Sequence, residues 1–262
     1  MHTHLEMLLT PGSLSPVFQA VVDGSAYGAP VFAYEGLIRG PVATNFEQPD
    51  VIFGYVRRLR CEERVDLACV RAILDEASLL PAGAVVSINV HAATLGRVRD
   101  FGDLVVAEAR ANGIAPDRIV LEIVEHGSAW SAPHFLAGIE NLRRLGLRIA
   151  LDDVGAGLSN YRMILDTRPD FFKIDRYVVT GCCADPDRRK VLVSIRDLAE
   201  AFGARVIAEG VETEQEAETL AELGIALMQG YLFARPMPAR SQSGMRKTRW
   251  SASRGSCESG AT

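Results

Sequence analysis

Short apolar runs alternate with amphipathic segments along most of the chain. Eight runs rich in β-branched and aromatic residues are predicted to be strands, at residues 18–23, 31–40, 85–90, 119–124, 149–151, 171–175, 205–210 and 226–233. Helical spacing of apolar residues predicts helices at residues 50–60, 62–80, 101–112, 133–145, 161–165, 185–202 and 214–223. Alternation of strand and helix predicts a largely parallel α/β sheet, and about eight strands in roughly 240 residues favour a closed barrel over an open sheet.

The first two strands are an exception to this alternation. Only a turn separates residues 18–23 from residues 31–40, which predicts a hairpin. Residues alternate between the two faces of a strand, so the second strand is expected to present Glu35, Leu37 and Arg39 on one side.

Composition suggests where the folded part begins and ends. Residues 1–16 are expected to be a lead-in without helix, because they contain the helix breakers Pro11, Gly12 and Pro16. Residues 17–238 are expected to form one domain. Residues 239–262 are rich in Ser, Arg and Gly and are predicted to be a disordered tail.

Charge and cysteine content narrow the class of protein. Hydrophobic residues make up 48% of the chain and charged residues 23%, which is typical of a globular domain. The net charge of −5 argues against bulk nucleic acid as a partner. The five cysteines include no CxxC pair and predict reduced thiols in the cytoplasm rather than a zinc site. No apolar run approaches the length of about 20 residues that spans a membrane, and no signal peptide is recognised.

Candidate chemistry is concentrated in residues 149–160. An apolar run ends in Asp152 and Asp153, and Gly155 and Gly157 follow. Carboxylates between a buried strand and a glycine-rich loop often bind a hard metal ion in α/β enzymes. A solvated acidic turn is the alternative interpretation of this segment alone.

Other strand ends favour the metal site. Polar residues recur at or near them: Glu35, Asn89, Glu122, Asp152, Asp153, Lys173, Glu209 and Gln229. In a barrel the carboxyl ends of the strands converge on one mouth. Oxygen ligands suit Mg²⁺, Mn²⁺ or Ca²⁺. Adjacent aspartates can serve two ions, which would clamp a phosphate and activate a water, and a buried lysine can orient that water.

These residues carry a family resemblance. Glu35-Gly-Leu-Ile-Arg39 resembles the signature of the EAL domain, a family of cyclic di-GMP phosphodiesterases. Further matching segments follow in order: Ser87-Ile-Asn89, Leu121-Glu-Ile-Val-Glu125, Asp152-Asp-Val-Gly-Ala-Gly157, Phe172-Lys-Ile-Asp175, Ala208-Glu-Gly-Val-Glu-Thr213 and Gln229-Gly-Tyr-Leu-Phe233. The resemblance covers about Phe18 to Pro236. It implies a modified TIM (β/α)8 barrel whose first strand is antiparallel to the others, in agreement with the predicted hairpin.

The resemblance also implies roles for individual residues. It implies hydrolysis of cyclic di-GMP to linear pGpG with two ions, Mg²⁺ or Mn²⁺, in a protein that commonly forms homodimers. The implied metal ligands are Glu35, Asn89, Glu122, Asp152, Asp153 and Glu209, and Asp152 would bridge the two ions. The implied catalytic residues are Glu35, Asp152, Asp153, Glu209 and Lys173. Lys173 would position the attacking water. The implied substrate-binding residues are Gln19, Leu37, Arg39 and Gln229. Glu125 would anchor the glycine loop.

Some positions depart from the family pattern. Val154, Ala156 and Leu158 stand where the family commonly has Phe, Thr and Tyr, Gly36 replaces the alanine of the EAL triplet, and Ala20 replaces a usual proline. These changes favour an alternative in which the domain has weak or no catalytic activity and acts as a cyclic di-GMP receptor or a protein-binding scaffold. Another phosphate-handling barrel enzyme is a more distant alternative. His91, just beyond Asn89, is predicted to have a structural role.

Overall fold

Eight strands close into a barrel in the order of the sequence. A computed structural model describes residues 3–26, 28–124, 133–155 and 161–242. The strands are β1 (Ser15–Asp23), β2 (Val31–Arg39), β3 (Val85–His91), β4 (Ile119–Val124), β5 (Arg148–Val154), β6 (Phe171–Ile174), β7 (Arg205–Ala208) and β8 (Leu227–Gln229). Strand β1 is antiparallel to both of its neighbours, β2 and β8, and the remaining pairs are parallel. The predicted barrel with an antiparallel first strand is therefore confirmed.

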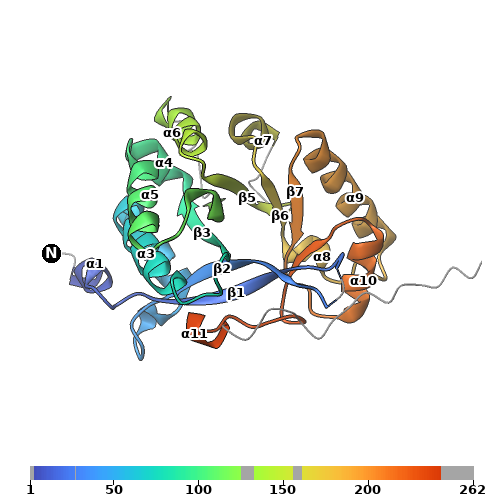
Figure 1. Ribbon diagram of the computed structural model, residues 1–262, viewed down its shortest axis with the longest axis horizontal. Coiled ribbons are helices and arrows are strands. Elements are labelled where there is room, and N and C mark those ends of the chain that lie inside the picture. The colour runs from blue at the N-terminus through green and yellow to red at the C-terminus, as the bar shows by residue number, and fades with distance from the viewer. Residues whose placement is uncertain (1–2, 27, 125–132, 156–160, 243–262) are drawn as a thin grey trace, which may run out of the picture.

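The β1–β2 hairpin brings a residue from the beginning of the chain to the centre of the barrel. The two strands lie side by side along one edge in Figure 1, with Gln19 opposite Glu35. On its other side β1 pairs Val21 with Gln229 of β8. The antiparallel strand thus closes the barrel and sets Gln19 between β2 and β8.

The interior of the barrel has an apolar layer and a polar layer. The apolar layer consists of one residue from each of seven strands: Val21, Ala33, Val120, Ala150, Phe171, Ile207 and Leu227. A polar residue lies two positions along the chain from each of these apolar residues, and therefore on the same side of the sheet. The polar residues are Gln19, Glu35, Glu122, Asp152, Lys173, Glu209 and Gln229. The apolar layer therefore forms a floor beneath a polar site at the mouth.

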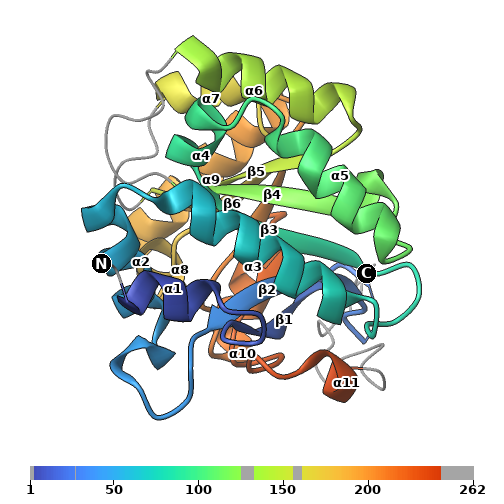
Figure 2. The same ribbon diagram turned by 90° about the vertical axis from the view of Figure 1, so that its left-hand side faces the viewer.

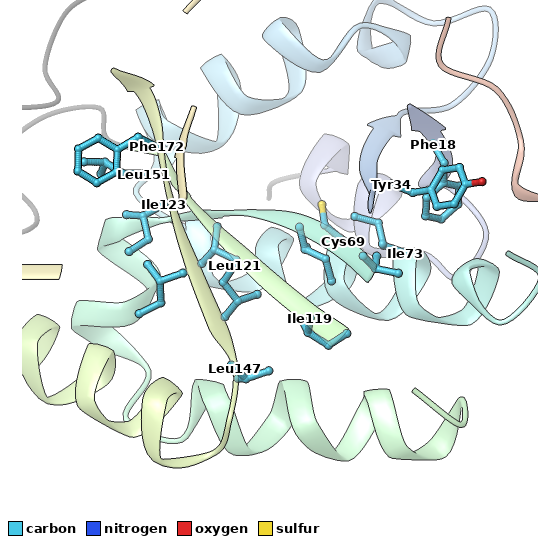
Figure 3. Packing of buried hydrophobic residues seen from close by; sticks show 14 of the residues in the cluster. Phe18, Tyr34, Cys69, Ile73, Ile119, Leu121, Ile123, Leu147, Leu151 and Phe172 are labelled. Atoms are coloured by element: carbon cyan, nitrogen blue, oxygen red, sulfur yellow. The ribbon is translucent and has the colours of Figure 1, made fainter. Parts of the chain in front are cut away.

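The outward faces of the strands pack against a ring of helices (Figures 1 and 2). These helices are α2 (Pro49–Leu59), α3 (Glu62–Ala77), α4 (Ala92–Arg97), α5 (Phe101–Ala111), α6 (Pro133–Arg144), α7 (Tyr161–Thr167), α8 (Arg176–Val179), α9 (Pro186–Ala201) and α10 (Glu214–Glu222), with 3-10 turns at Asn45–Glu47 and Pro116–Arg118. Figure 3 shows side chains of this layer, including Leu121 of β4 and Ile73 of α3. Among the described residues, no helix is long and apolar enough to cross a membrane.

Side-chain caps determine where the helix after β7 starts. The Thr213 side chain accepts a hydrogen bond from the backbone N–H of Glu216, and the Glu216 carboxylate accepts one from the backbone N–H of Thr213. Together the two hydrogen bonds form a capping box. The Glu216 carboxylate also accepts from the backbone N–H groups of Glu212 and Gly181. This half-buried network ties the loop after β7, which begins with Glu209, to the loop after α8.

The two ends of the described chain differ from the prediction. Helix α1 (Thr3–Leu9) forms in the segment expected to lack helix, because it ends before Pro11 and buries Leu5 and Leu8 against the core near α3 (Figure 2). At the other end, the first residues of the predicted disordered tail form helix α11 (Ala239–Gln242) beside β1. The buried Gln242 side chain donates to the Phe18 carbonyl at 2.7 Å, a tertiary contact that composition does not reveal.

Candidate active site

A buried lysine lies at the centre of the polar layer. Lys173 of β6 is 1% exposed. Its Nζ lies 2.5 Å from Glu122, 2.6 Å from Glu209, 3.3 Å from Asp152 and 3.5 Å from Glu35. Glu122 lies on β4, Asp152 on β5 and Glu35 on β2, and Glu209 directly follows β7. The closed barrel thus brings together groups that are far apart in sequence. Burying an ammonium group without such partners would be strongly unfavourable.

Hydrogen bonds fix the orientation of Glu35. Its Oε1 accepts from Asn89 Nδ2 at 2.8 Å and its Oε2 from Gln229 Nε2 at 2.7 Å. Gln229 also donates to Gln19 Oε1 at 3.2 Å, and Gln19 donates to the Ala234 carbonyl at 3.0 Å. With both Asn89 and Gln229 acting as donors, Glu35 is held in place from two sides.

Glu122 is held by a residue to which the sequence analysis gave no role. Ser87 Oγ donates to Glu122 Oε1, and Lys173 donates to Oε2. Ser87 lies two residues before Asn89 on β3, so the strand period alone places both on the inner face. That alternation is the sequence signal that identifies Ser87.

The paired aspartates reach the same cavity because β5 is irregular. In a regular strand Asp152 and Asp153 would face opposite sides. The β5–β6 register shifts between Leu151 and Val154, and Asp153 has a positive φ of 52°. Such a bulge re-aims a side chain, and aspartate tolerates the left-handed conformation better than most residues. Strand β5 ends at Val154, three residues beyond its predicted end at Leu151.

Three carboxylates among the described residues lie close enough together to hold a metal ion. Oxygens of Asp152, Asp153 and Glu209 all lie within 4.8 Å of one another. An all-oxygen, anionic donor set fits a hard divalent cation. Glu35 and Glu122 lie beside this set because both contact Lys173, and Asn89 lies there because it donates a hydrogen bond to Glu35.

The charges in the cluster shift one another's pKa values. Burial alone would lower the pKa of Lys173, but the surrounding carboxylates raise it well above its usual value. Burial would raise the pKa of Glu35, but Lys173 and the hydrogen bonds from Gln229 and Asn89 lower it overall. Burial and the charge of Glu35 raise the pKa of Glu122 far above its usual range, against the effect of Lys173. Lys173 therefore remains a cation, while protons compete for part of the carboxylate set.

Two cavities flank Glu35 and Glu209. The larger, of about 360 Å³, contains Lys173 and the paired aspartates. The smaller, of about 240 Å³, is lined by Gln19 and Gln229 among others. Glu35, Leu37 and Glu209 line both cavities, so Leu37 lies between them.

The family model named EAL domain matches residues 3–236. The chain belongs to the EAL domain family. The probable cyclic di-GMP phosphodiesterase PdeA of Escherichia coli K12 is 32% identical over 193 residues, which are 72% of this chain and 26% of PdeA. The cyclic di-GMP phosphodiesterase RocR of Pseudomonas aeruginosa is 34% identical over 152 residues, 58% of this chain and 38% of RocR. The chain thus spans well under half the length of these curated relatives.

Solved structures show the same fold. A manganese and cyclic di-GMP complex of Klebsiella pneumoniae BlrP1 matches with a TM-score of 0.77 and 28% identity, over 88% of this chain and 57% of that chain. A standalone EAL protein from Vibrio cholerae O395, bound to cyclic di-GMP, matches with a TM-score of 0.76 and 26% identity, over 86% of this chain and 92% of that chain. A further BlrP1 complex contains calcium with cyclic di-GMP. One protein similar to this EAL domain, BlrP1, is thus known in complexes with a divalent cation and cyclic di-GMP.

Some expected site residues lie outside the two cavities or outside the described residues. Arg39 does not line either cavity, and its guanidinium donates to the Ile38 carbonyl at 3.0 Å. Glu125, Ala156 and Leu158 lie outside the described residues. Val154 is buried and pairs with Ile174 of β6, so this departure from the family leaves the strand formed.

The glycine in the EAL triplet is matched to a neighbouring helix. A Cβ added at Gly36 would lie 2.6 Å from Cγ2 of Ile73 on α3, closer than real Cβ contacts. Ile73 thus occupies the space that the family's alanine needs. This departure is a packing adjustment beside Glu35 that leaves the carboxylate itself in place.

Cation binding by the site is expected to strengthen as the pH rises from about 6 to about 8. Burial, with the charges of Asp152 and Asp175, raises the pKa of Asp153 to about 6. Burial, with Asp152 and Glu35, raises that of Glu209 to about 8 against the lowering effect of Lys173. A bound cation must displace these protons, so affinity rises with pH, by about tenfold per unit for each displaced proton. Calorimetric titration of metal-stripped protein with Mn²⁺ at several pH values measures this effect.

Replacing Glu209 with Gln provides the control for this titration. The variant lacks the group that titrates near 8. Its weaker affinity for Mn²⁺ is expected to vary little at the upper end of the range. Equal Mn²⁺ affinity of the unsubstituted protein across the whole range would contradict the assignment of these carboxylates to the metal site.

Proposed function

We propose that this EAL domain hydrolyses one phosphodiester bond of cyclic di-GMP and releases linear pGpG. The observation that carries the proposal is the contact of Lys173 with four carboxylates within 3.5 Å in the cavity of an EAL domain. The names of the relatives PdeA and RocR support the substrate, and the presence together of Glu35, Glu122, Asp152, Asp153 and Glu209 supports turnover rather than binding alone.

The donor chemistry supports a pair of Mg²⁺ or Mn²⁺ ions as cofactors. Four carboxylates contact the Lys173 ammonium group, and a fifth, that of Asp153, lies with Asp152 and Glu209, so carboxylates outnumber the one cation and divalent ions would balance them. We assign the ligands to Glu35, Asn89, Glu122, Asp152, Asp153 and Glu209, with Asp152 shared between the ions. When bound, such ions lower the pKa of a water and offset charge on the phosphate.

The side chains of this chain would orient the reactants. Lys173, held by Glu122 and Glu209, would donate a hydrogen bond to the attacking water. Gln19 and Gln229, joined to each other and facing the smaller cavity, would contact the substrate beside Leu37. Contact of Arg39 with a substrate phosphate would require its guanidinium to leave the Ile38 carbonyl.

A chromatographic assay of cyclic di-GMP with Mg²⁺ or Mn²⁺ tests the proposal. The unsubstituted protein is expected to form pGpG. Glu35→Ala is expected to lower the rate by roughly a thousandfold, because it removes a metal ligand and the acceptor that Asn89 and Gln229 share. Glu222→Ala, an exposed change at the end of α10, is the matched control and should retain the rate.

The remaining outcomes separate the alternative functions. Binding of cyclic di-GMP without product would indicate a receptor and contradict the hydrolase. Absence of both binding and product would leave a protein-binding scaffold. A homodimer and a cytoplasmic location stay predictions, which light scattering and cell fractionation would test.

A further inference from the structure

Strand β3 donates one hydrogen bond to each of two buried glutamates. In the register of the sheet, Ser87 lies opposite Glu35 of β2, and Asn89 lies opposite Glu122 of β4. The hydrogen bonds run diagonally across this register, because Asn89 donates to Glu35 and Ser87 donates to Glu122. Strands of a closed barrel are tilted and staggered, so side chains at one depth of the interior come from diagonal positions. The proposed hydrolysis assigns a role to three of these residues and none to Ser87.

Two donors hold the Glu122 carboxylate, one on each oxygen. Ser87 Oγ donates to Oε1, and Lys173 Nζ donates to Oε2 at 2.5 Å. Ser87 is 4% exposed and Glu122 is 1% exposed, so water has little access to this contact. Rotation of the carboxylate would break a buried hydrogen bond, which is costly. The two donors therefore fix the orientation of Glu122.

The Ser87 hydroxyl acts on the site through Glu122. Ser87 lines neither of the two cavities, so it does not contact a ligand bound there. Lys173 is shared among four carboxylates, whereas a serine hydroxyl has a single proton to donate, and Ser87 donates it to Glu122. Ser87 is therefore a positioning group and not one that touches substrate.

The fixed orientation of Glu122 affects which cation suits the site. Ca²⁺ takes more oxygen ligands than Mg²⁺ does and accepts a more flexible arrangement of them. Each hydrogen bond to the carboxylate occupies a lone pair that would otherwise be free for an ion. A rigid carboxylate with fewer free lone pairs favours the smaller cation.

We propose that Ser87 positions Glu122 and thereby favours Mg²⁺ over Ca²⁺ in the cation site. This role rests on the proposed function, which assigns Glu122 to a divalent cation. It adds Ser87 to the residues on which cation binding depends.

Calorimetric titrations of metal-stripped protein with Mg²⁺ and with Ca²⁺, at one pH and without dinucleotide, test this preference. Ser87→Ala is expected to weaken Mg²⁺ binding by roughly tenfold or more, as is typical when a group that orients a metal ligand is lost. Ca²⁺ binding is expected to weaken less, because a freed carboxylate suits the more flexible ion. The ratio of the two dissociation constants therefore shifts toward Ca²⁺.

Two further variants separate the hydroxyl from the shape of the side chain. Threonine and valine are similar in shape, but only threonine has a hydroxyl. Ser87→Thr is expected to retain the preference for Mg²⁺, and Ser87→Val is expected to lose it. Ser194→Ala, which removes an exposed hydroxyl that donates to the Lys190 carbonyl on α9, is the control and should bind both cations normally. Urea unfolding in EDTA checks that each variant is folded.

Several results would overturn the role of Ser87. Unchanged affinity for both cations in folded Ser87→Ala would show that the hydroxyl does not position Glu122. Equal affinities of Ser87→Thr and Ser87→Val would show the same. An equal loss of Mg²⁺ and Ca²⁺ binding in Ser87→Ala would overturn the preference, and so would the failure of the unsubstituted protein to bind either cation.

The pGpG assay keeps this role apart from the proposed function. If the unsubstituted protein forms pGpG while the Ser87 variants bind cations as it does, the role of Ser87 is wrong and the hydrolysis stands. If the cation preferences follow the expected order but no pGpG forms, the proposed function is wrong and the role of Ser87 stands.

Discussion

Replacing Lys173 with methionine is expected to slow the hydrolysis of cyclic di-GMP strongly and to destabilise the metal-free protein. Lys173 is 1% exposed and lies within 3.5 Å of carboxylates on Glu35, Glu122, Asp152 and Glu209. Methionine retains much of the side-chain length but has no charge and no N–H donor. The variant leaves these carboxylates facing one another without the cation that compensates them.

The expected size of this effect follows from burial. Removing one partner of a buried ion pair typically costs about 3–5 kcal/mol of unfolding free energy. Loss of a donor that stabilises developing charge lowers the rate by about a hundredfold to a thousandfold. Urea unfolding in EDTA measures the first quantity, and chromatography of pGpG with saturating Mn²⁺ measures the second.

Lys190→Met is the matched control. Lys190 also pairs with a carboxylate, Asp187, at 2.8 Å, but the two side chains are 77% and 86% exposed. Exposed ion pairs contribute less than about 1 kcal/mol, so stability and activity should be close to those of the unsubstituted protein. A Lys173→Met protein that unfolds and hydrolyses like Lys190→Met would contradict the central role of the buried lysine.

Gly230→Ala is expected to destabilise the fold by about 3 kcal/mol and to reduce activity, because the new methyl group would collide with backbone. Gly230 directly follows Gln229 of β8, and a Cβ there would lie 2.0 Å from the Val211 carbonyl oxygen and 2.4 Å from its nitrogen. Val211 donates to the Gln229 carbonyl at 3.0 Å and accepts from Leu232 at 3.1 Å. This crossing of the loops after β7 and β8 holds Glu209 and Gln229 in register.

The same substitution at another glycine provides the control. Gly54 lies inside α2, and a Cβ there would have no neighbour within 4 Å. Alanine favours a helix interior over glycine, so Gly54→Ala should raise stability by about 0.5–1 kcal/mol. Thermal unfolding and the cyclic di-GMP assay compare the two variants. A Gly230→Ala protein as stable as Gly54→Ala would show that the loop crossing shifts without cost.

The hydrophobic pattern predicted the strand and helix order because burial imposes a period on each element. All eight predicted strands form, and each of the seven predicted helices forms with small shifts at its ends. Helices α1, α4, α8 and α11 were not predicted, because each is at most seven residues long and depends on tertiary contacts. The buried side chain of Gln242, in the segment assigned to a disordered tail, is an example.

The sequence by itself determined the barrel, its reversed first strand and the identity of the acidic residues, since these depend on local periodicity and motif order. Only the tertiary structure decided which groups meet. It brought the carboxylates onto Lys173, turned Asp153 into the cavity through a bulge, placed Arg39 outside both cavities and set His91 against Asp66. Such contacts join residues 25 to more than 130 positions apart, and no local pattern encodes a distance across a closed sheet.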